Sequence, residues 1–425
     1  MLQKGDYKAI LVAILGRGAC YNPQMSMANA NLSTSAPGVS GGKTSLQVLP
    51  NLISGGVERG AVDVAQALVQ AGWRAIVASA GGPMVRELER AGAEHIVLPL
   101  NTKNPLAIRR NAQTLATLIR DQGVDVVHAR SRAPAWSARE AAKLASVPFM
   151  TTFHGIYGLG PFGLKKLYNR VMASGEIVIA VSEFVRDHVM REYHVPPERI
   201  RVIHRGVDLN LFDANRVSPT RLIQMTTKWR IQESSQVVML PGRLTALKGH
   251  DLLIDAIAEL KRRGGGQTGV RCVMVGQDHG RTNHRTYITN YAAARGVDVH
   301  IVDDCNDMAA AYMATDVVVS ASTRPEAFGR VVAEAQAMGR PVVAPSHGPS
   351  SEIIVPGVTG WLFTPSDPVS LADALERALN LGQEERIRMA EAAITRARTL
   401  FSKADMCART LNVYEELLTR HRAGS

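Results

Sequence analysis

The sequence predicts an α/β protein made of two doubly wound domains, and three observations support this prediction. The chain has 425 residues, enough for about two or three domains of ordinary size. Hydrophobic residues make up 46% and charged residues 20%, which is typical of a globular protein rather than a disordered or fibrous one. Short β-branched runs alternate with segments of helical period, the pattern of parallel sheets joined by crossover helices.

The first series of strands follows a segment that is rich in Asn, Ser, Gly and Pro and has no hydrophobic period. We predict that residues 1–44 are a disordered extension, in which Met25 and Met27 offer alternative natural starts. Helical periods lie between the strands, as at Val57–Ala71 and Leu106–Asp121. The strands expected within residues 45–213 are Leu46–Pro50, Ala75–Ala78, Ile96–Leu98, Val124–His128, Phe149–Phe153, Ile177–Val181 and Ile200–Ile203.

The alternation pauses after Phe212 in a polar stretch, so we place the domain boundary near residues 213–235. A second doubly wound domain is expected over residues 214–403. The last helical segment, in residues 404–425, has no strand after it, and we expect it to return to the first domain. A ligand is expected between the two domains, at the C-terminal strand ends. The strands expected in the second series are Val237–Leu240, Arg271–Val275, His300–Val302, Asp316–Val319 and Pro341–Ala344.

Charge and cysteine content narrow the classes of partner. The formal net charge is +11, of which +9 falls in residues 1–220, and this indicates an anionic partner for that half. A membrane surface, a phosphorylated substrate or a nucleic acid would fit, but aromatic residues are only 5% and no basic helix carries interleaved aromatics, so nucleic acid is disfavoured. The cysteines have no metal-binding spacing, which favours a reduced cytosolic compartment without zinc; they are Cys20, Cys272, Cys305 and Cys407.

Two glycine-rich stretches are similar to phosphate-binding loops but match them incompletely. Residues 38–44, GVSGGKT, have Pro37 where the P-loop spacing needs its first glycine, and no strand precedes them. Residues 158–163, GLGPFG, match G-x-G-x-x-G, but Pro161 has no N–H to donate to a phosphate. We therefore interpret the first as a flexible linker and do not assign a dinucleotide to the second.

The strongest signal for a ligand site is the segment 325–344. We expect a strand, a short loop and a helix that opens near Glu326, with backbone N–H groups at its amino end forming an anion site; these belong to Ala327, Phe328, Gly329 and Arg330. Glu326 and Glu334 are eight residues apart, about 12 Å along a helix. This separation suits two ends of one extended ligand better than a shared acid/base pair. A solvated helix face with two carboxylates is the alternative.

A second element follows the strand Val237–Leu240. Arg243 and Lys248 flank the loop that connects this strand to the next helix. An arginine offers a fork of donors to a phosphate and a lysine offers a compact charge, so together they could neutralise a pyrophosphate leaving group. Two basic residues that only keep the surface soluble are the alternative.

With these motifs, the chain resembles the retaining glycosyltransferases of the family-4 type, whose GT-B fold has two Rossmann-like domains facing a cleft. Its E-x-F-G-x-x-x-x-E element matches Glu326–Glu334, and its G-R-L-x-x-x-K-G element matches Gly242–Gly249. The junction V-x-x-x-G-x-D-x-x-x-F matches Val202–Phe212, and a G-G-x-E-R turn matches Gly55–Arg59. The resemblance covers residues 46–420. More narrowly, the chain is similar to bacterial transferases that build lipopolysaccharide core and other envelope glycans.

The resemblance implies roles for the donor side. Glu326 would accept hydrogen bonds from the donor sugar, the amides after it would hold the sugar and the β-phosphate, and Glu334 would bind the ribose hydroxyls. Arg243 and Lys248 would bind the pyrophosphate. The residues expected near the nucleotide are Gly276 and Gln277.

For the first domain, the resemblance implies that Gly55 and Gly56 allow the backbone to approach the phosphates, since no Cβ obstructs them. His154 matches a histidine near the reacting sugar, with a structural histidine as the alternative. The catalytic group would then consist of Glu326, Arg243, Lys248 and His154.

The activity that the resemblance implies is transfer of a sugar from a nucleotide-diphosphate sugar to a glycan or lipid-linked acceptor, with retention at the anomeric carbon and no metal or other cofactor. A nucleotide-sugar epimerase on the same fold is one alternative, and a nucleotide-sugar-binding protein without turnover is another. Two departures from the family pattern stand out. Arg205 replaces a common Asn, and residues 347–352, HGPSSE, replace a Gly-Gly pair before a Glu. The second departure leaves the donor sugar open.

Membrane contact is the last expectation. Residues 162–172 join apolar and basic residues at helical spacing, as in a helix that rests on anionic lipid. The alternative is a helix that packs on its own sheet with solvated lysines. No apolar run approaches the about 20 residues of a spanning helix, so we expect a cytoplasmic protein that is peripheral at most, on the inner face of the membrane.

Overall fold

The computed structural model describes residues 42–53, 55–158, 160, 163–232, 234–264, 269–277 and 282–424. These residues form two compact units, each with one parallel sheet. Residues 42–206 together with 403–424 make up the N-terminal unit, and Val207–Ser402 make up the C-terminal unit. The prediction of two doubly wound α/β domains is confirmed. Of the extension predicted to be disordered, residues 1–41 lie outside the described residues. The prediction is wrong for Thr44, which already belongs to the first strand.

The sheet of the N-terminal unit has the order β3-β2-β1-β4-β5-β6-β7, and all its neighbouring strands are parallel. The order reverses between β1 and β4, so the loops that follow these two strands leave the sheet side by side. The bounds are β1 Thr44–Val48, β2 Arg74–Ser79, β3 Glu94–Val97, β4 Val126–Ala129, β5 Phe149–Phe153, β6 Ile177–Ala180 and β7 Ile200–Val202.

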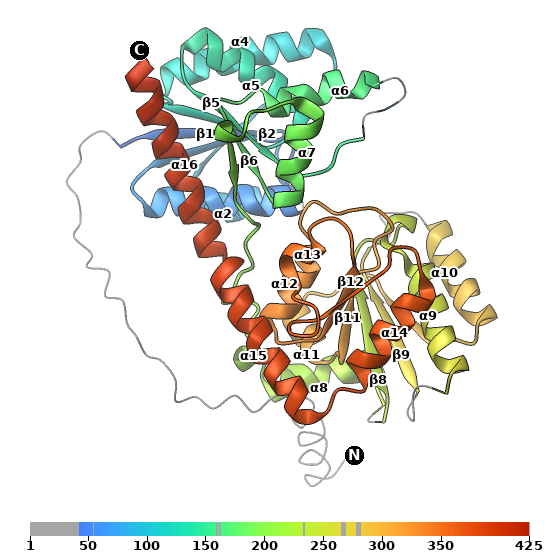
Figure 1. Ribbon diagram of the computed structural model, residues 1–425. Coiled ribbons are helices and arrows are strands. Elements are labelled where there is room, and N and C mark those ends of the chain that lie inside the picture. Colours follow the sequence, from blue (N-terminus) through green and yellow to red (C-terminus); the bar gives the residue numbers. More distant parts are fainter. Residues whose placement is uncertain are drawn as a thin grey trace. The chain divides into compact units, whose positions relative to one another are not determined.

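Helices cover both faces of this sheet, with α4 and α5 on one side and α2 on the other (Figure 1). The apolar side chains of α2 share a buried core with strands β2, β4, β5 and β6 and with α16, although α16 comes from the end of the chain. The helices are α2 Gly56–Gln70, α3 Val85–Arg90, α4 Pro105–Asp121, α5 Arg132–Ala145, α6 Leu164–Asn169, α7 Glu183–Tyr193 and α16 Lys403–Gly424.

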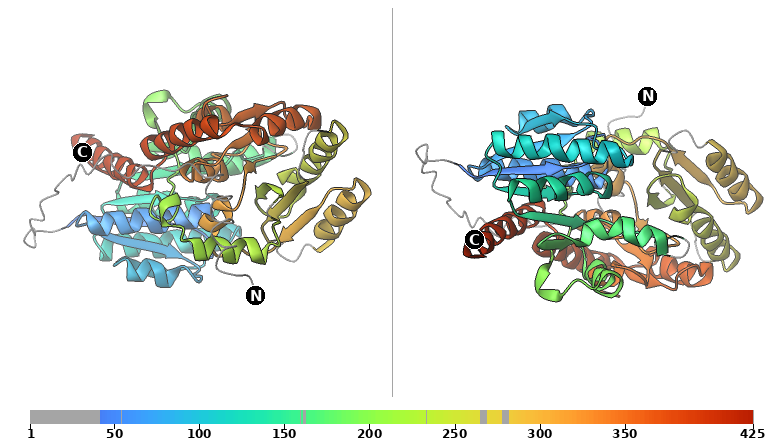
Figure 2. Two further views of the ribbon diagram at one scale, coloured as in Figure 1. Left: turned by 90° about the horizontal axis from the view of Figure 1, so that it is seen from below. Right: turned by 90° about the horizontal axis from the view of Figure 1, so that it is seen from above.

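The sheet of the C-terminal unit has the order β10-β9-β8-β11-β12-β13, also parallel, with its reversal between β8 and β11. The strands are β8 Gln236–Pro241, β9 Val270–Val275, β10 Val299–Val302, β11 Val317–Val319, β12 Val342–Pro345 and β13 Trp361–Phe363. Helices flank it on both sides (Figure 2). They are α8 Pro219–Lys228, α9 His250–Arg262, α10 Thr282–Ala294, α11 Met308–Met313, α12 Arg330–Ala337, α13 Ser350–Ile353, α14 Pro368–Leu379 and α15 Gln383–Leu400.

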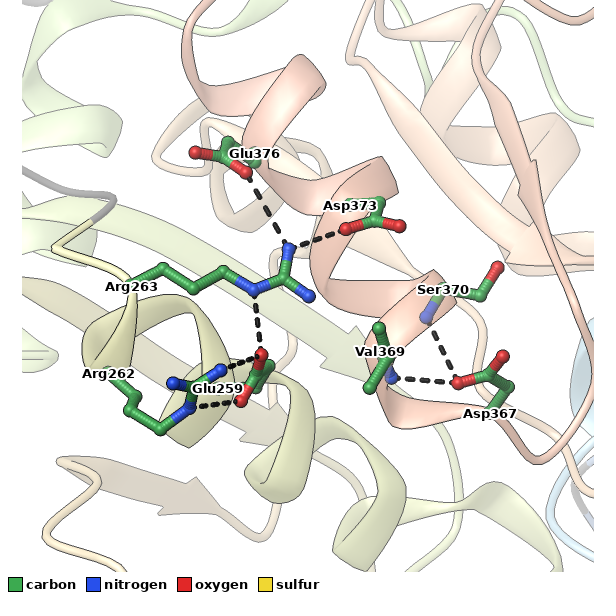
Figure 3. A network of polar contacts seen from close by, with 8 residues as sticks. All are labelled: Glu259, Arg262, Arg263, Asp367, Val369, Ser370, Asp373 and Glu376. Atoms are coloured by element: carbon green, nitrogen blue, oxygen red, sulfur yellow. Dashed lines mark hydrogen bonds and ion pairs between the residues drawn. The ribbon is translucent and has the colours of Figure 1, made fainter.

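Helices α9 and α14 pack together over this sheet, and a charged network joins them at the surface (Figure 3). Arg263 contacts Glu259 of α9 at 2.7 Å and Asp373 of α14 at 2.5 Å. Asp367 caps α14, since its side chain accepts hydrogen bonds from the amides of Val369 and Ser370. The two arginines Arg262 and Arg263 lower the pKa of Glu259 to about 2, so the network stays charged over the physiological range.

Several local predictions differ from the structure. The polar stretch near residues 213–235 contains helix α8, which begins at Pro219 after the capping side chain of Ser218. Strand β13 was not predicted, because three residues are too few to show a period. The helix expected over residues 162–172 is two shorter pieces: α6 ends at Asn169 and a 3₁₀ turn covers Arg170–Ala173. Among the described residues, no helix is both long and apolar enough to cross a membrane.

Candidate functional site

The predicted site residues of the C-terminal unit lie on loops at the carboxyl edge of its sheet and on helix α12, which follows one of these loops. Strands β8 and β11 are neighbours at the point where the strand order reverses. In open parallel sheets, ligands bind at this point, beyond the carboxyl ends of the strands. The loop after β8 carries Arg243 and Lys248, and the loop after β11 carries Glu326.

Lys248 and Glu326 form an ion pair across the two loops. Lys248 Nζ lies 2.5 Å from Glu326 Oε1, and the hydroxyl of Ser322 donates to the same oxygen at 2.5 Å. Burial alone would raise the pKa of Glu326, but Lys248 and Ser322 outweigh it and hold this pKa below its ordinary value. Glu326 is therefore ionised at neutral pH. Its side chain keeps 29% of its surface exposed, and that of Lys248 keeps 23%, so a ligand can reach both groups.

Glu334 is held from two sides. Arg330 Nη2 lies 2.8 Å from Oε1, and the hydroxyl of Tyr312 donates to Oε2 at 2.9 Å. Burial, and then the Glu334 charge, raise the pKa of Tyr312 well above its ordinary value, so this hydroxyl remains a donor. Each carboxylate oxygen can accept more than one hydrogen bond. The two partners thus fix the orientation of Glu334 and leave its oxygens able to accept from a ligand.

The predicted helix start at Glu326 is wrong, because α12 begins at Arg330. Gly329 precedes it with φ of 89°, in the left-handed region that glycine adopts without strain. Of the four amides expected at the amino end, only that of Arg330 belongs to the helix, while Ala327 and Phe328 lie in the loop before it. Phe328 is buried against the ring of Phe401, with centroids 5.6 Å apart, and so anchors this loop to the core.

The loops after β8 and β9 touch through their backbones. The amide of Gly242 donates to Val275 O at 2.8 Å, and that of Leu244 donates to Gln277 O at 3.1 Å. A Cβ on Gly276 would lie 1.9 Å from Gly242 O, so only glycine fits there. Gly276 and Gln277 are therefore next to the loop of Arg243, whose side chain is exposed and has no ion pair among the residues that the structure describes.

His347, in the loop after β12, is a neighbour of Glu326 that was not predicted as a site residue. Its proximity contributes to lowering the pKa of Glu326, and neither of its ring nitrogens has a hydrogen-bond partner within the described part of the chain. The turn at Gly348 packs against Pro325, since a Cβ on Gly348 would lie 3.1 Å from Pro325 Cβ. The sequence signal that could have indicated His347 was the replacement of the family's Gly-Gly pair by residues 347–352, which the sequence analysis treated only as a departure from the family pattern.

The predicted residues of the N-terminal unit also lie at a carboxyl edge. Gly55 and Gly56 open α2 after β1, and His154 follows β5. Arg205 donates to the carbonyl of Gly56 and lies 3.3 Å from His154 Nδ1. Because arginine can only donate, Nδ1 is the acceptor and the proton of the neutral ring is on Nε2. Burial, followed by the charges of Arg130 and Arg205, keeps the pKa of His154 well below its ordinary value.

His154 is thus a neutral hydrogen-bond donor at the sheet edge. Its Nε2 has no partner among the described residues. This geometry does not suit a general base, which would need an unprotonated nitrogen toward the substrate. It suits a group that donates to a ligand oxygen. Among all the residues that the structure describes, no cluster of three or more His, Cys, Asp or Glu residues could hold a metal.

Two parallel sheets, each with glycine turns and cationic side chains at the edge where the strand order reverses, define a class of two-domain α/β proteins that bind anionic ligands. Comparison with known sequences narrows this class. The model of Glycosyltransferase Family 4 matches residues 54–211, and that of Glycosyl transferases group 1 matches residues 224–396. A D-inositol 3-phosphate glycosyltransferase of Xylanimonas cellulosilytica is 30% identical over 70% of this chain and 73% of its own length. The protein therefore belongs to the glycosyltransferases that these two models, family 4 and group 1, describe.

Other comparisons are shorter or more distant. The D-inositol 3-phosphate glycosyltransferase of a Nocardioides species is 29% identical over 58% of this chain, which spans only 54% of that relative. The crystal structure of a glycosyltransferase from Rickettsia africae has a TM-score of 0.82 and 36% identity, and covers 89% of this chain and 99% of its own. Anabaena HepE in complex with UDP and glucose has a TM-score of 0.75 at 23% identity, covers 88% and 100%, and is similar in fold.

Proposed function

We propose that the protein transfers a sugar from a nucleotide-diphosphate sugar to an acceptor hydroxyl. The observation that carries this proposal is the Lys248–Glu326 pair at the strand reversal of the C-terminal unit. It offers an ionised carboxylate to accept from sugar hydroxyls and an ammonium group for a phosphate, side by side and both partly exposed. Family membership supports the same reaction. An epimerase or a binding protein is not favoured by any observation.

Donor binding would use the groups on the loops after β8, β9 and β11. Arg243 is exposed beside Gly276, where it can reach a diphosphate, and Lys248 supplies the second cation. Two cations can balance the charge that develops on a departing nucleotide diphosphate, which is the work that a metal ion does elsewhere. We propose transfer without a metal and with retention of the anomeric configuration, as the resemblance to retaining enzymes implies.

The acceptor would bind to the N-terminal unit, which carries most of the net positive charge. The curated relatives are named for D-inositol 3-phosphate, a phosphorylated polyol, and this supports an acceptor that bears a phosphate. A lipid-linked or glycan acceptor in envelope synthesis stays within the same proposal. The exposed Leu167, with 64% of its surface free, and the neighbouring Lys165 support contact with an anionic membrane. Co-sedimentation with anionic but not neutral vesicles would test that contact.

Substitution of Lys248 tests the roles in the donor site. We expect Lys248→Ala to lower turnover by about two orders of magnitude or more, because an electrostatic partner of the leaving group is lost. The measurement is nucleotide release from a panel of nucleotide sugars, with and without a phosphorylated polyol. Lys261→Ala, which removes an exposed lysine of α9, is the matched control and should turn over normally. Near-normal transfer by the Lys248 variant would contradict the assignment.

Product analysis separates the alternatives. Incubation with donor alone should give at most slow hydrolysis by a transferase, whereas an epimerase would convert the donor into an isomer. A binding protein would release no nucleotide, whether the donor is incubated alone or together with an acceptor.

A further inference from the structure

The loop after β12 brings a histidine beside the carboxylate of Glu326. Strands β11 and β12 are parallel neighbours, with Val319 paired to Val343. Their carboxyl ends therefore open at the same edge of the sheet. Glu326 lies on the loop after β11, and His347 lies only two residues beyond the end of β12. In open parallel sheets, groups at this edge are the ones that contact a ligand.

The backbone fixes how these two loops meet. Gly348 has φ of 62°, in the left-handed region, and turns the chain directly after His347. A Cβ on Gly348 would lie 3.1 Å from Pro325 Cβ and 3.4 Å from Glu326 O, so the turn packs on the backbone that carries Glu326. On the other side of His347, the amide of Ser346 donates to a carbonyl of β13 at 2.8 Å. His347 is thus held between two anchored residues.

The ring of His347 carries two buried polar atoms without partners. Both Nδ1 and Nε2 are buried, and neither has a hydrogen-bond partner among the described residues. His250, by comparison, lacks a partner on Nε2 alone. Buried polar atoms are nearly always hydrogen-bonded, because an unmade bond costs free energy. An imidazole has at least one N–H in either protonation state, so the ring offers a donor that the described residues do not satisfy and a ligand can.

Glu326 and His347 complement each other toward a hydroxyl group. The two partners of Glu326, Lys248 and Ser322, both lie on Oε1, and none of the described residues bonds to Oε2. An ionised carboxylate can only accept, so it satisfies the hydrogen of a sugar hydroxyl but not the lone pairs of its oxygen. A ring N–H of His347 can donate to that oxygen. The two side chains together therefore match both functions of one hydroxyl.

We propose that His347 is a specificity residue for the donor, and that it donates to the same sugar hydroxyl whose hydrogen Glu326 accepts. This rests on the proposed glycosyltransferase function and deepens it, because the donor must then carry a free hydroxyl at this position of its sugar. A sugar without that hydroxyl leaves both side chains unpartnered. Sites built to hydrogen-bond a hydroxyl reject the deoxy analogue far more strongly than an apolar pocket rejects a change in size.

Binding of deoxy donors to the full chain tests this contact without relying on turnover. Isothermal titration with a panel of UDP-, GDP- and ADP-linked hexoses selects as probe the nucleotide sugar that binds most tightly. The wild type should bind this probe about a hundredfold more tightly than one of its monodeoxy analogues, which identifies the hydroxyl. His347→Phe keeps a ring without its nitrogens and should reduce that ratio by about threefold to tenfold, the effect of one neutral hydrogen bond.

Two controls accompany this experiment. His300→Phe makes the same exchange on β10, the strand at the far edge of the same sheet, and should leave the ratio unchanged. The nucleoside diphosphate of the probe, without its sugar, should bind the wild type and His347→Phe about equally. His347→Ala is a second variant in case His347→Phe does not fold, as judged by circular dichroism, and it should lower the ratio in the same direction.

The proposal is overturned if the wild type binds every monodeoxy analogue as tightly as the probe, or if both variants of His347 keep the wild-type ratios. It is also overturned if these variants weaken the nucleoside diphosphate as strongly as the probe, because the ring would then contact the diphosphate. Failure of the proposed function would look different. No acceptor would then cause nucleotide release from the probe, while a hydroxyl preference that depends on His347 would remain. If the wild type binds no member of the panel, both proposals fail together.

Discussion

Single glycines set the shape of the donor-side loops. Gly249 has φ of 66° and ends the turn that carries Lys248. A Cβ at this position would lie 2.0 Å from Ala321 O, two residues after the end of β11, so the turn after β8 packs directly on the segment that leads to Glu326. The approach of Lys248 to Glu326 therefore depends on a residue that takes no part in the chemistry.

Gly249→Ala should accordingly lower the unfolding free energy of the C-terminal unit by more than the backbone strain of a left-handed alanine alone. A left-handed alanine costs about 1–2 kcal/mol, and the backbone clash adds to this cost. Gly264→Ala is the matched control, because Gly264 has φ of 72° and nothing within 4 Å of its Cβ position. Urea unfolding of both variants measures the difference. Equal losses of unfolding free energy would show that the contact with Ala321 is not tight.

Among the elements, α16 has the most distant partners in the sequence. Its Tyr414 is fully buried, and the hydroxyl lies 2.7 Å from His128 Nδ1 on β4. The other ring nitrogen of His128 lies 2.7 Å from Thr152 Oγ1 on β5. A single buried histidine thus links the last helix of the chain to two central strands of the N-terminal sheet.

Tyr414→Phe should lower the unfolding free energy of the N-terminal unit by about 1–3 kcal/mol, because it leaves a buried ring nitrogen without a partner. Thermal or urea unfolding measures this loss. Tyr287→Phe removes a hydroxyl from a side chain that is 45% exposed and should cost little. If the two variants unfold alike, the link through His128 does not hold α16 in place.

At the scale of the whole molecule, buried neutral histidines make stability depend on pH. Burial is the main cause that lowers the pKa of His128, His154 and His250, the last to about 4. Below about pH 6.5 the unfolded chain binds protons that the folded chain does not, so unfolding becomes easier as pH falls, by up to about 1.4 kcal/mol per histidine and pH unit.

We therefore expect the urea midpoint to fall steadily from pH 7.5 to 5.5, before most carboxylates titrate. His154→Gln should reduce the slope, since one of the groups no longer takes up a proton on unfolding. A flat profile in the wild type would contradict the burial of these rings.

The sequence was sufficient for the architecture but only partly for the site. Strand β5 was predicted with its bounds unchanged, since Phe149–Phe153 is a buried β-branched and aromatic run between turns. The start of α12 was missed because the left-handed Gly329 delays the helix to Arg330. Partners such as Tyr312 and Ser322 could not be predicted, because tertiary packing rather than a motif brings them to the two glutamates.

The return of α16 to the N-terminal unit also sets an order of assembly during synthesis. The C-terminal unit is one continuous segment, Val207–Ser402, and can close its core as soon as that segment has left the ribosome. The N-terminal unit cannot, since Met406, Tyr414 and Leu417 belong to its core and are translated after Ser402. Domains usually mature in the order in which they are made. Here the domain that is made first is completed last, and until then its sheet lacks the helix that covers part of its apolar face.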